Sequence, residues 1–175
     1  GMSAIQIAQQ LGATRVIAAD RDPTKLALAQ RLGAVPLDVR GLGPEAGADA
    51  VRALTEGRGV DVAVELVGHG DTVQLALKSV APLGRAVVVG LNDVPVPIDS
   101  YRDLIGREAE LIGSNDHLLG ELEELTAMAA RGALVLDDVV TNRVALDADA
   151  INAVLDALEQ HRAPVRTVIV PDSAG

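Results

Sequence analysis

The 175-residue sequence contains no cysteine, no phenylalanine and no tryptophan, and it has a single tyrosine. Without cysteine the chain can form neither a disulfide nor a thiolate zinc site. The three histidines (His69, His117 and His161) lack the spacing of metal ligands, so we interpret them as solvent-facing or cap-adjacent residues. The near absence of aromatic side chains removes the platform on which nucleic-acid bases stack.

Positive charge and long apolar runs are also scarce. Acidic residues outnumber basic ones by 25 to 15, which gives a net charge of −10. This charge argues against binding to nucleic acid or to an anionic membrane surface. No apolar run approaches the ~20 residues of a membrane span, and the start shows no signal-peptide pattern. The sequence therefore predicts a cytoplasmic protein without a nucleic-acid or membrane partner.

Hydrophobic residues make up 49% of the chain and are mostly Ala, Val and Leu, as is typical of parallel strands buried on both faces. Helix-type and strand-type segments alternate along the sequence. We expect helices at residues 3–11, 22–32, 49–54, 71–80, 117–131 and around 151–158, and strands at 15–20, 35–39, 59–68, 84–91, 111–114, 139–146 and 165–170. This alternation predicts an α/β fold, a doubly wound parallel sheet in three layers, α/β/α.

The run Arg15–Asp20 is an apolar strand that ends on an acid and follows a small-residue helix. In dinucleotide-binding βαβ units, an acid at this place accepts hydrogen bonds from a ribose diol. Asp20 would favour NAD(H) over NADP(H), because a 2′-phosphate would meet like charge. The neighbouring Arg21 leaves NADP(H) open, and Lys25 could reach the same ribose. The alternative for Asp20 is a cap of the next helix, although Asp22 is already placed for that role.

Gly68 and Gly90 follow two buried strands at their carboxyl ends, where open α/β sheets bind ligands. They either admit a ligand close to the backbone or merely end the strands. Residues 41–47 hold three glycines, but their spacing and Pro44 do not suit a phosphate loop, so we expect a plain connection. The polar group at residues 114–117 reads as a loop and helix start. No nucleophile–base pair, paired carboxylate or metal cluster emerges, so we assign no catalytic residue.

Taken in order, these segments resemble the medium-chain, zinc-type alcohol dehydrogenase family. The matching segments are residues 1–8, 11–13, 16–20, 25–29, 32–34, 54–68, 84–90, 111–114 and 163–171. The resemblance implies hydride transfer between an alcohol carbon and nicotinamide, with zinc polarising the oxygen. It also implies roles for individual residues: Asp20 and Lys25 at the adenosine ribose, Leu66, Val67 and Gly68 on the adenosine side, Val89, Gly90 and Leu91 on the nicotinamide side, and Arg166 at the pyrophosphate.

The sequence also departs from the family pattern. The family's first strand, most of its glycine-rich turn and its zinc-holding N-terminal domain have no counterpart here. We therefore expect an incomplete NAD(P)-binding Rossmann domain at 1–115, a segment resembling the return to the catalytic domain at 116–175, and no turnover by this chain alone.

Without the first strand, two half-sheets keep unpaired inner edges. We expect these edges to pair with each other or with another copy, which predicts a homodimer or a strand-swapped oligomer. The alternative functions are a non-catalytic dimerising Rossmann module and an unrelated doubly wound binder such as a methyltransferase.

Overall fold

The structure, a computed structural model, describes residues 1–160 and 162–171. Its first group of elements contains α1 (Met2–Gln10), β1 (Ile17–Asp20), α2 (Pro23–Arg31) and β2 (Val35–Asp38). Strands β1 and β2 run parallel, with Ile17 opposite Val35 and Asp20 opposite Asp38. Helix α2 begins at Pro23 because the Asp22 carboxylate accepts a hydrogen bond from the Thr24 amide at 2.8 Å.

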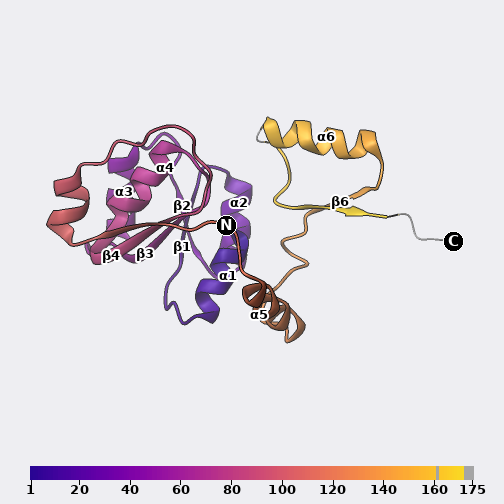
Figure 1. The fold of residues 1–175 in the computed structure, drawn as a ribbon, viewed down its shortest axis with the longest axis horizontal. Coiled ribbons are helices and arrows are strands. Elements are labelled where there is room, and N and C mark those ends of the chain that lie inside the picture. Colours follow the sequence, from indigo (N-terminus) through magenta and orange to yellow (C-terminus); the bar gives the residue numbers. More distant parts are fainter. Residues whose placement is uncertain (161, 172–175) are drawn as a thin grey trace.

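The second group of elements forms a three-stranded parallel sheet in the order β3–β4–β5. Its elements are α3 (Pro44–Ala53), β3 (Val60–Glu65), α4 (Gly70–Ser79), β4 (Val80–Val88), a π-helix (Ser100–Leu104), a 3-10 helix (Ile105–Arg107) and β5 (Glu110–Gly113). Helix α3 packs on α4, and α4 covers one face of β3 and β4, where Leu77, Val80 and Ala86 form a core (Figure 1).

The largest differences from the expected boundaries in this group are the starts of α3 and β4, while β3 and β4 also end earlier than expected, at Glu65 and Val88. Residues 44–47, expected in a plain connection, form the first turn of α3, because Pro44 occupies the position where a helix tolerates proline best. Strand β4 begins at Val80 instead of residue 84. Its register with β3 shifts after Val60 pairs with Val80, so the strand carries an irregularity that its sequence pattern does not reveal.

The two groups of strands form separate sheets, β1–β2 and β3–β4–β5. The α/β fold with parallel strands is confirmed, but the expectation that the two inner edges pair with each other is wrong for the described residues. Helix α2 packs on β1 and β2, and helix α4 packs on β3 and β4. Pairing with another copy stays a prediction.

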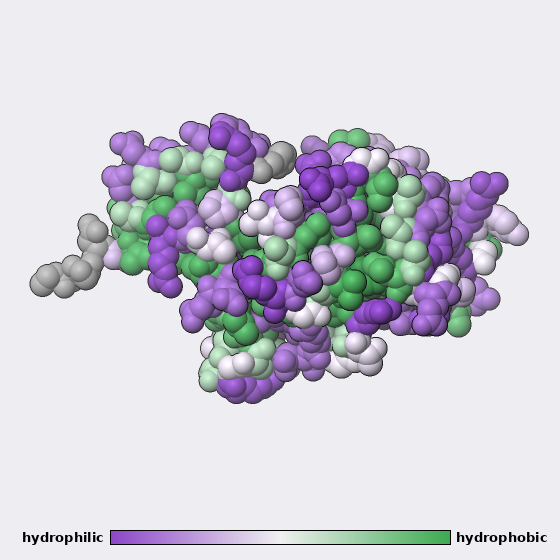
Figure 2. Space-filling model, turned by 180° about the vertical axis from the view of Figure 1, so that it is seen from behind, coloured by the Kyte–Doolittle hydropathy of each residue, from purple (hydrophilic) through white to green (hydrophobic). Residues whose placement is uncertain are grey.

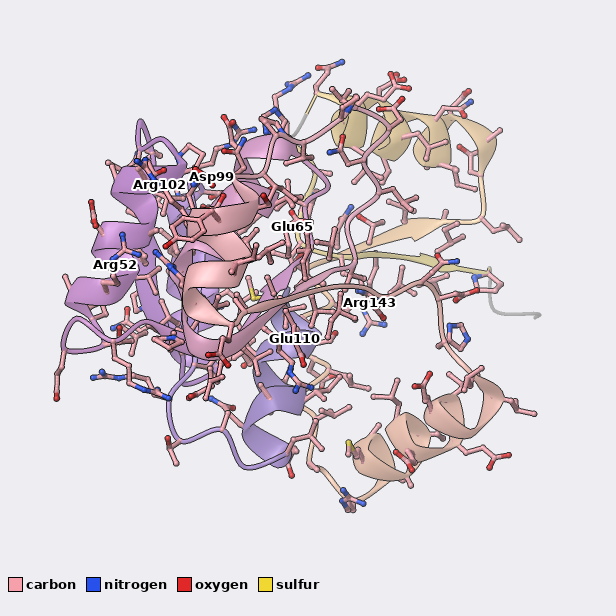
Figure 3. The ribbon with its side chains drawn as sticks, turned by 60° about the vertical axis from the view of Figure 1, so that its left-hand side comes forward. Arg52, Glu65, Asp99, Arg102, Glu110 and Arg143 are labelled. Atoms are coloured by element: carbon pink, nitrogen blue, oxygen red, sulfur yellow. The ribbon has the colours of Figure 1, made fainter. Side chains whose placement is uncertain are left out.

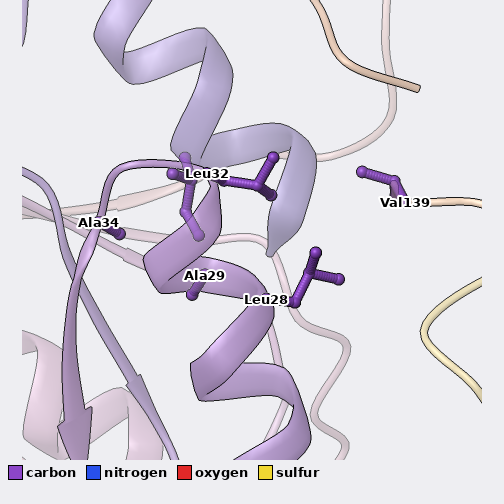
Figure 4. Close-up of a cluster of buried hydrophobic side chains, with 6 residues drawn as sticks. Leu28, Ala29, Leu32, Ala34 and Val139 are labelled. Carbon is purple, nitrogen blue, oxygen red and sulfur yellow. The ribbon is translucent and has the colours of Figure 1, made fainter. Parts of the chain in front are cut away.

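The C-terminal segment forms a third, two-stranded parallel sheet. Its elements are α5 (Leu119–Ala130), β6 (Asn142–Ala145), α6 (Ala148–Glu159) and β7 (Thr167–Val170). The Gln6 side chain of α1 exchanges two hydrogen bonds with the main chain of Val135, at 2.6 and 3.2 Å. Val139 is buried in the core around Leu28 of α2 and Leu32, the residue that follows this helix (Figure 4). These contacts attach the segment to the first group.

Several apolar side chains remain exposed. Helix α5 has no buried residue, and Leu122 on it and Leu118 before it are exposed. On β3, Val62 and Val64 point away from α4 and are about half exposed, because Ala63 between them takes the core face. Figure 2 shows hydrophobic side chains gathered on the face of the molecule seen from behind.

Lys78 of α4 forms two ion pairs, a buried one with Asp103 of the π-helix and an exposed one with Glu45 of α3. The Nζ atom of Lys78 lies 2.9 Å from both Glu45 and Asp103, and the Asp103 side chain is only 6% exposed. Arg52 and Arg107 each donate to the Lys78 carbonyl at 2.8 Å. Burial lowers the pKa of Lys78, but the hydrogen bonds and charges of Asp103 and Glu45 outweigh burial, so this pKa is raised above its ordinary value.

Lys78→Met is expected to lower the free energy of unfolding by about 3 kcal/mol, because it leaves the Asp103 carboxylate buried without its cation. The matched control Glu45→Gln should cost less than about 1 kcal/mol, since Glu45 is 76% exposed. Urea unfolding measures both. Because the folded pKa of Lys78 is raised, the wild-type advantage over Lys78→Met is complete from neutral pH up to pH 10.5 and is lost as the pH rises through the folded value. Equal losses in the two variants would contradict this account.

The turns that follow β3 and β4 touch through their backbones. A Cβ atom on Gly90 would overlap the Gly68 amide nitrogen, and a Cβ on Gly68 would overlap the Leu91 carbonyl. Gly68 also has a φ of +81°, which favours glycine. Both positions therefore need glycine for the contact between the two turns, apart from any approach of a ligand.

Gly90→Ala is expected to lower the free energy of unfolding by about 2 kcal/mol or more, because the obstacle is backbone and cannot move as a side chain can. Gly120→Ala in α5, where a Cβ meets nothing within 4 Å, is the control and should leave stability unchanged or raise it by less than about 1 kcal/mol. Thermal unfolding followed by circular dichroism compares the two. An alanine tolerated equally at both positions would disprove the backbone contact.

Candidate functional site

Asp20 ends β1, and its carboxylate is held by the turn that follows. Its Oδ1 atom accepts hydrogen bonds from the amides of Arg21 at 2.7 Å and Asp22 at 2.9 Å. The cap of α2 is Asp22, which accepts from Thr24, so the alternative that Asp20 caps this helix is wrong. The two amides fix the orientation of the Asp20 carboxylate at the end of the strand, as a hydrogen-bond acceptor for a ligand requires.

Three charged side chains lie around the start of α1. Burial lowers the pKa of the Gly1 amino group, the positive charges of Arg166 and Lys25 lower it further, and the negative charge of Asp20 raises it. Asp20, Lys25 and Arg166 are therefore close enough to this helix end to act on the same group, although Arg166 comes from the end of the chain, just before β7. Two cations and a helix N-terminus together favour an anion such as a pyrophosphate.

A second set of predicted residues lies at the carboxyl ends of β3 and β4. Leu66 and Val67 are 39% and 72% exposed, and Val89 and Leu91 are 38% and 89% exposed. Gly68 and Gly90 lie between them and are half-buried against each other. Exposed apolar side chains at this edge of a parallel sheet are suited to contact the flat, apolar parts of a ligand. Arg21, the remaining candidate, is exposed at the end of β1.

Glu65, the last residue of β3, is not among the site residues predicted from the sequence. Its side chain is buried, and its Oε1 atom accepts from the amides of Val67 at 2.8 Å and Gly68 at 2.9 Å and from the Thr72 hydroxyl at 2.7 Å (Figure 3). Its carbonyl accepts from the amides of Val89 and Gly90. Strand alternation places Glu65 on the same face as Ala63, toward α4, and this signal was available in the sequence.

No metal centre accompanies these residues. Within residues 1–160 and 162–171, no group of three or more His, Cys, Asp and Glu side chains could hold a metal ion. The Nδ1 atom of His117 lies 2.7 Å from the Oδ1 atom of Asp116 on the surface before α5, in agreement with the expected loop and helix start.

An apolar hollow lies between α6 and the strands β6 and β7, and Arg166 contributes to its lining. None of the described helices is long and apolar enough to cross a membrane.

Comparisons with known proteins give the family. The model of the zinc-binding dehydrogenase family matches residues 1–131. The chain is 30% identical over 148 residues to an L-threonine 3-dehydrogenase of Bacillus licheniformis, covering 84% of this chain and 42% of that protein. It is also 30% identical over 174 residues to a probable zinc-binding alcohol dehydrogenase of Mycobacterium tuberculosis, covering 99% and 43%.

Solved structures that match this chain are also alcohol dehydrogenases. The alcohol dehydrogenase of Aeropyrum pernix matches with a TM-score of 0.83 and 32% identity, covering 96% of this chain and 46% of that one. The alcohol dehydrogenase of Thermus sp. ATN1 matches with a TM-score of 0.81 and 27% identity, covering 97% and 47%. The chain thus spans less than half the length of these relatives. Because the family model covers well over half of the chain and the predicted parallel α/β fold is confirmed, this chain belongs to the zinc-binding dehydrogenase family.

Proposed function

We propose that this chain is the nicotinamide-dinucleotide-binding portion of a zinc-type, NAD(P)-dependent alcohol or polyol dehydrogenase. The observation that carries the proposal is the gathering of Asp20, Lys25 and Arg166 around the start of α1. Asp20 and Lys25 would bind the adenosine ribose, and Arg166 with the helix N-terminus would bind the pyrophosphate. Family membership supports this reading.

The exposed apolar side chains at the ends of β3 and β4 complete the proposed site. We call them the apolar set: Leu66, Val67, Val89 and Leu91. Leu66, Val67 and Gly68 would line the adenosine side, and Val89, Gly90 and Leu91 would line the nicotinamide side. Because Gly68 and Gly90 already touch each other, a ligand would meet the exposed side chains beside them more than the glycines themselves.

A bound nicotinamide would supply the hydride acceptor or donor for an alcohol carbon. The described residues offer no ligand set for zinc, so we derive no catalytic step from them and propose that the ion is held outside them. On this proposal the 175 residues alone bind cofactor without turnover. NAD(H) is favoured over NADP(H), since the fixed Asp20 carboxylate would repel a 2′-phosphate.

Asp20→Asn is expected to weaken NADH binding by about tenfold, because hydrogen bonds from the ribose to a charged acceptor are replaced by weaker ones. NADPH binding should improve relative to NADH, since the like charge is removed. Isothermal titration calorimetry with both dinucleotides measures the change. Asp61→Asn is the control. Asp61 is exposed, pairs with Arg58 and lies at the start of β3, whereas the proposed site is at the carboxyl ends of the strands. Unchanged affinities in Asp20→Asn would exclude Asp20 as the ribose acceptor, and binding of S-adenosylmethionine instead of NADH would favour the methyltransferase alternative.

We also propose that the chain forms a homodimer through residues 111–114, whether it binds cofactor or serves only as a dimerising module. This proposal is supported by the exposure of every residue of β5 at the edge of its sheet. Because the Ser114 amide donates inward to Val88, alternation directs the Leu111 and Gly113 amides to the outer edge.

Leu111→Pro, which removes one of these outward amides, is expected to convert the dimer to a monomer, whereas Leu111→Ala keeps the amide and should stay dimeric. Light scattering at tens of micromolar distinguishes the two states. A wild-type monomer under these conditions, or a dimer that survives the proline, would contradict pairing through β5.

A further inference from the structure

Glu65 is a buried acid that the proposed site does not use. The residue is 3% exposed and ends β3, one of the two strands whose ends form the apolar set. Three donors converge on its Oε1 atom: two amides of the following turn and the Thr72 hydroxyl of α4. An ionised carboxylate, which only accepts hydrogen bonds, suits such a group of donors.

The second carboxylate oxygen is buried and has no hydrogen-bond partner among the described residues. It lies against the turn after β4, because a Cβ atom on Gly90 would come within 2.7 Å of Oε2. The Glu65 carbonyl accepts from the amides of Val89, at 2.9 Å, and Gly90, at 3.2 Å, so main chain and side chain of Glu65 both meet this turn.

This geometry places the negative charge of the Glu65 carboxylate beside Gly90, in the turn formed by residues 89–91. The donors compensate the charge at Oε1, on the side of the 66–68 turn, and leave it uncompensated at Oε2, on the side of Gly90. Water does not screen a buried charge as it screens an exposed one, so the field of Oε2 extends through the turn. A cationic group bound on the outer side of the turn would be stabilised, and a neutral group of the same shape would not.

We propose that Glu65 sets the redox-state preference of the site, favouring the oxidised, cationic nicotinamide over the reduced, neutral one through the turn at Val89–Leu91. This inference rests on the proposed function, which places the nicotinamide beside these residues. Glu65 is a positioning residue: it holds both turns and contributes its charge, and it does not touch the cofactor. A buried carboxylate with one satisfied and one unsatisfied oxygen thereby gains a role beyond folding.

The test is the ratio of two dissociation constants, for NAD⁺ and for NADH, measured by calorimetry on the 175-residue chain. Glu65→Gln removes the charge and keeps the shape, so the Kd for NAD⁺ should rise relative to that for NADH by about tenfold. Thr72→Val is the matched control, because it removes one donor to Oε1 and keeps the charge. It should alter both constants by the same factor and leave the ratio unchanged.

Equal weakening of both cofactor forms by Glu65→Gln would overturn the inference and leave Glu65 a structural residue, while the proposed function stands. Binding of neither form by the wild type would overturn the proposed function and the inference with it. If thermal unfolding shows that Glu65→Gln does not fold, Glu65→Asp decides: its carboxylate is withdrawn from Gly90 by one methylene, so the ratio should shift in the same direction by a smaller factor. An unchanged ratio in Glu65→Asp would then refute the inference.

Discussion

The backbone contact between the turns after β3 and β4 is the constraint on which the candidate site depends. Gly68 and Gly90 approach so closely that neither position has room for a Cβ atom. The two strands must therefore end together, and their following residues emerge side by side as exposed apolar side chains. Glu65 reinforces the contact from within, because it accepts amide hydrogen bonds from both turns. Packing of the backbone thus decides what this edge of the sheet can present to a ligand.

The two parts of the proposed site rely on different physical forces. Around the start of α1 the forces are electrostatic: a fixed carboxylate, two cations and the end of a helix. At the ends of β3 and β4 they are contacts with apolar surface. A dinucleotide has the same division, with charged phosphates and polar ribose hydroxyls between flat rings. The charged and apolar parts of the proposed site thus correspond to the charged and apolar parts of a dinucleotide. The proposal therefore rests on the chemistry of the residues as well as on the fold.

The C-terminal segment is needed for the electrostatic part. The charge of Arg166 acts on the Gly1 amino group at the start of α1. The segment that carries Arg166 is attached through the paired hydrogen bonds of Gln6 with Val135 and through burial of Val139 beside Leu28. These contacts join residues from opposite ends of the chain. The division into a Rossmann domain at 1–115 and a C-terminal segment at 116–175 therefore stays a proposal, and the proposed site draws on residues from both sides of it.

Local patterns in the sequence were sufficient for the parallel α/β class, for most helices and strands, for the cap at Asp22 and for Asp20 at the end of its strand, because periodicity and capping act over a few residues. Features that depend on contacts between residues far apart in the sequence were visible only in the tertiary structure. The π-helix at residues 100–104 is joined to α4 by the Lys78–Asp103 ion pair. The early start of β4 pairs Val80 with Val60 of β3, and Thr72 of α4 donates a hydrogen bond to the buried Glu65. Only the tertiary structure likewise shows that β1 and β3 lie in separate sheets. The sequence of an edge strand does not identify the strand with which it will pair.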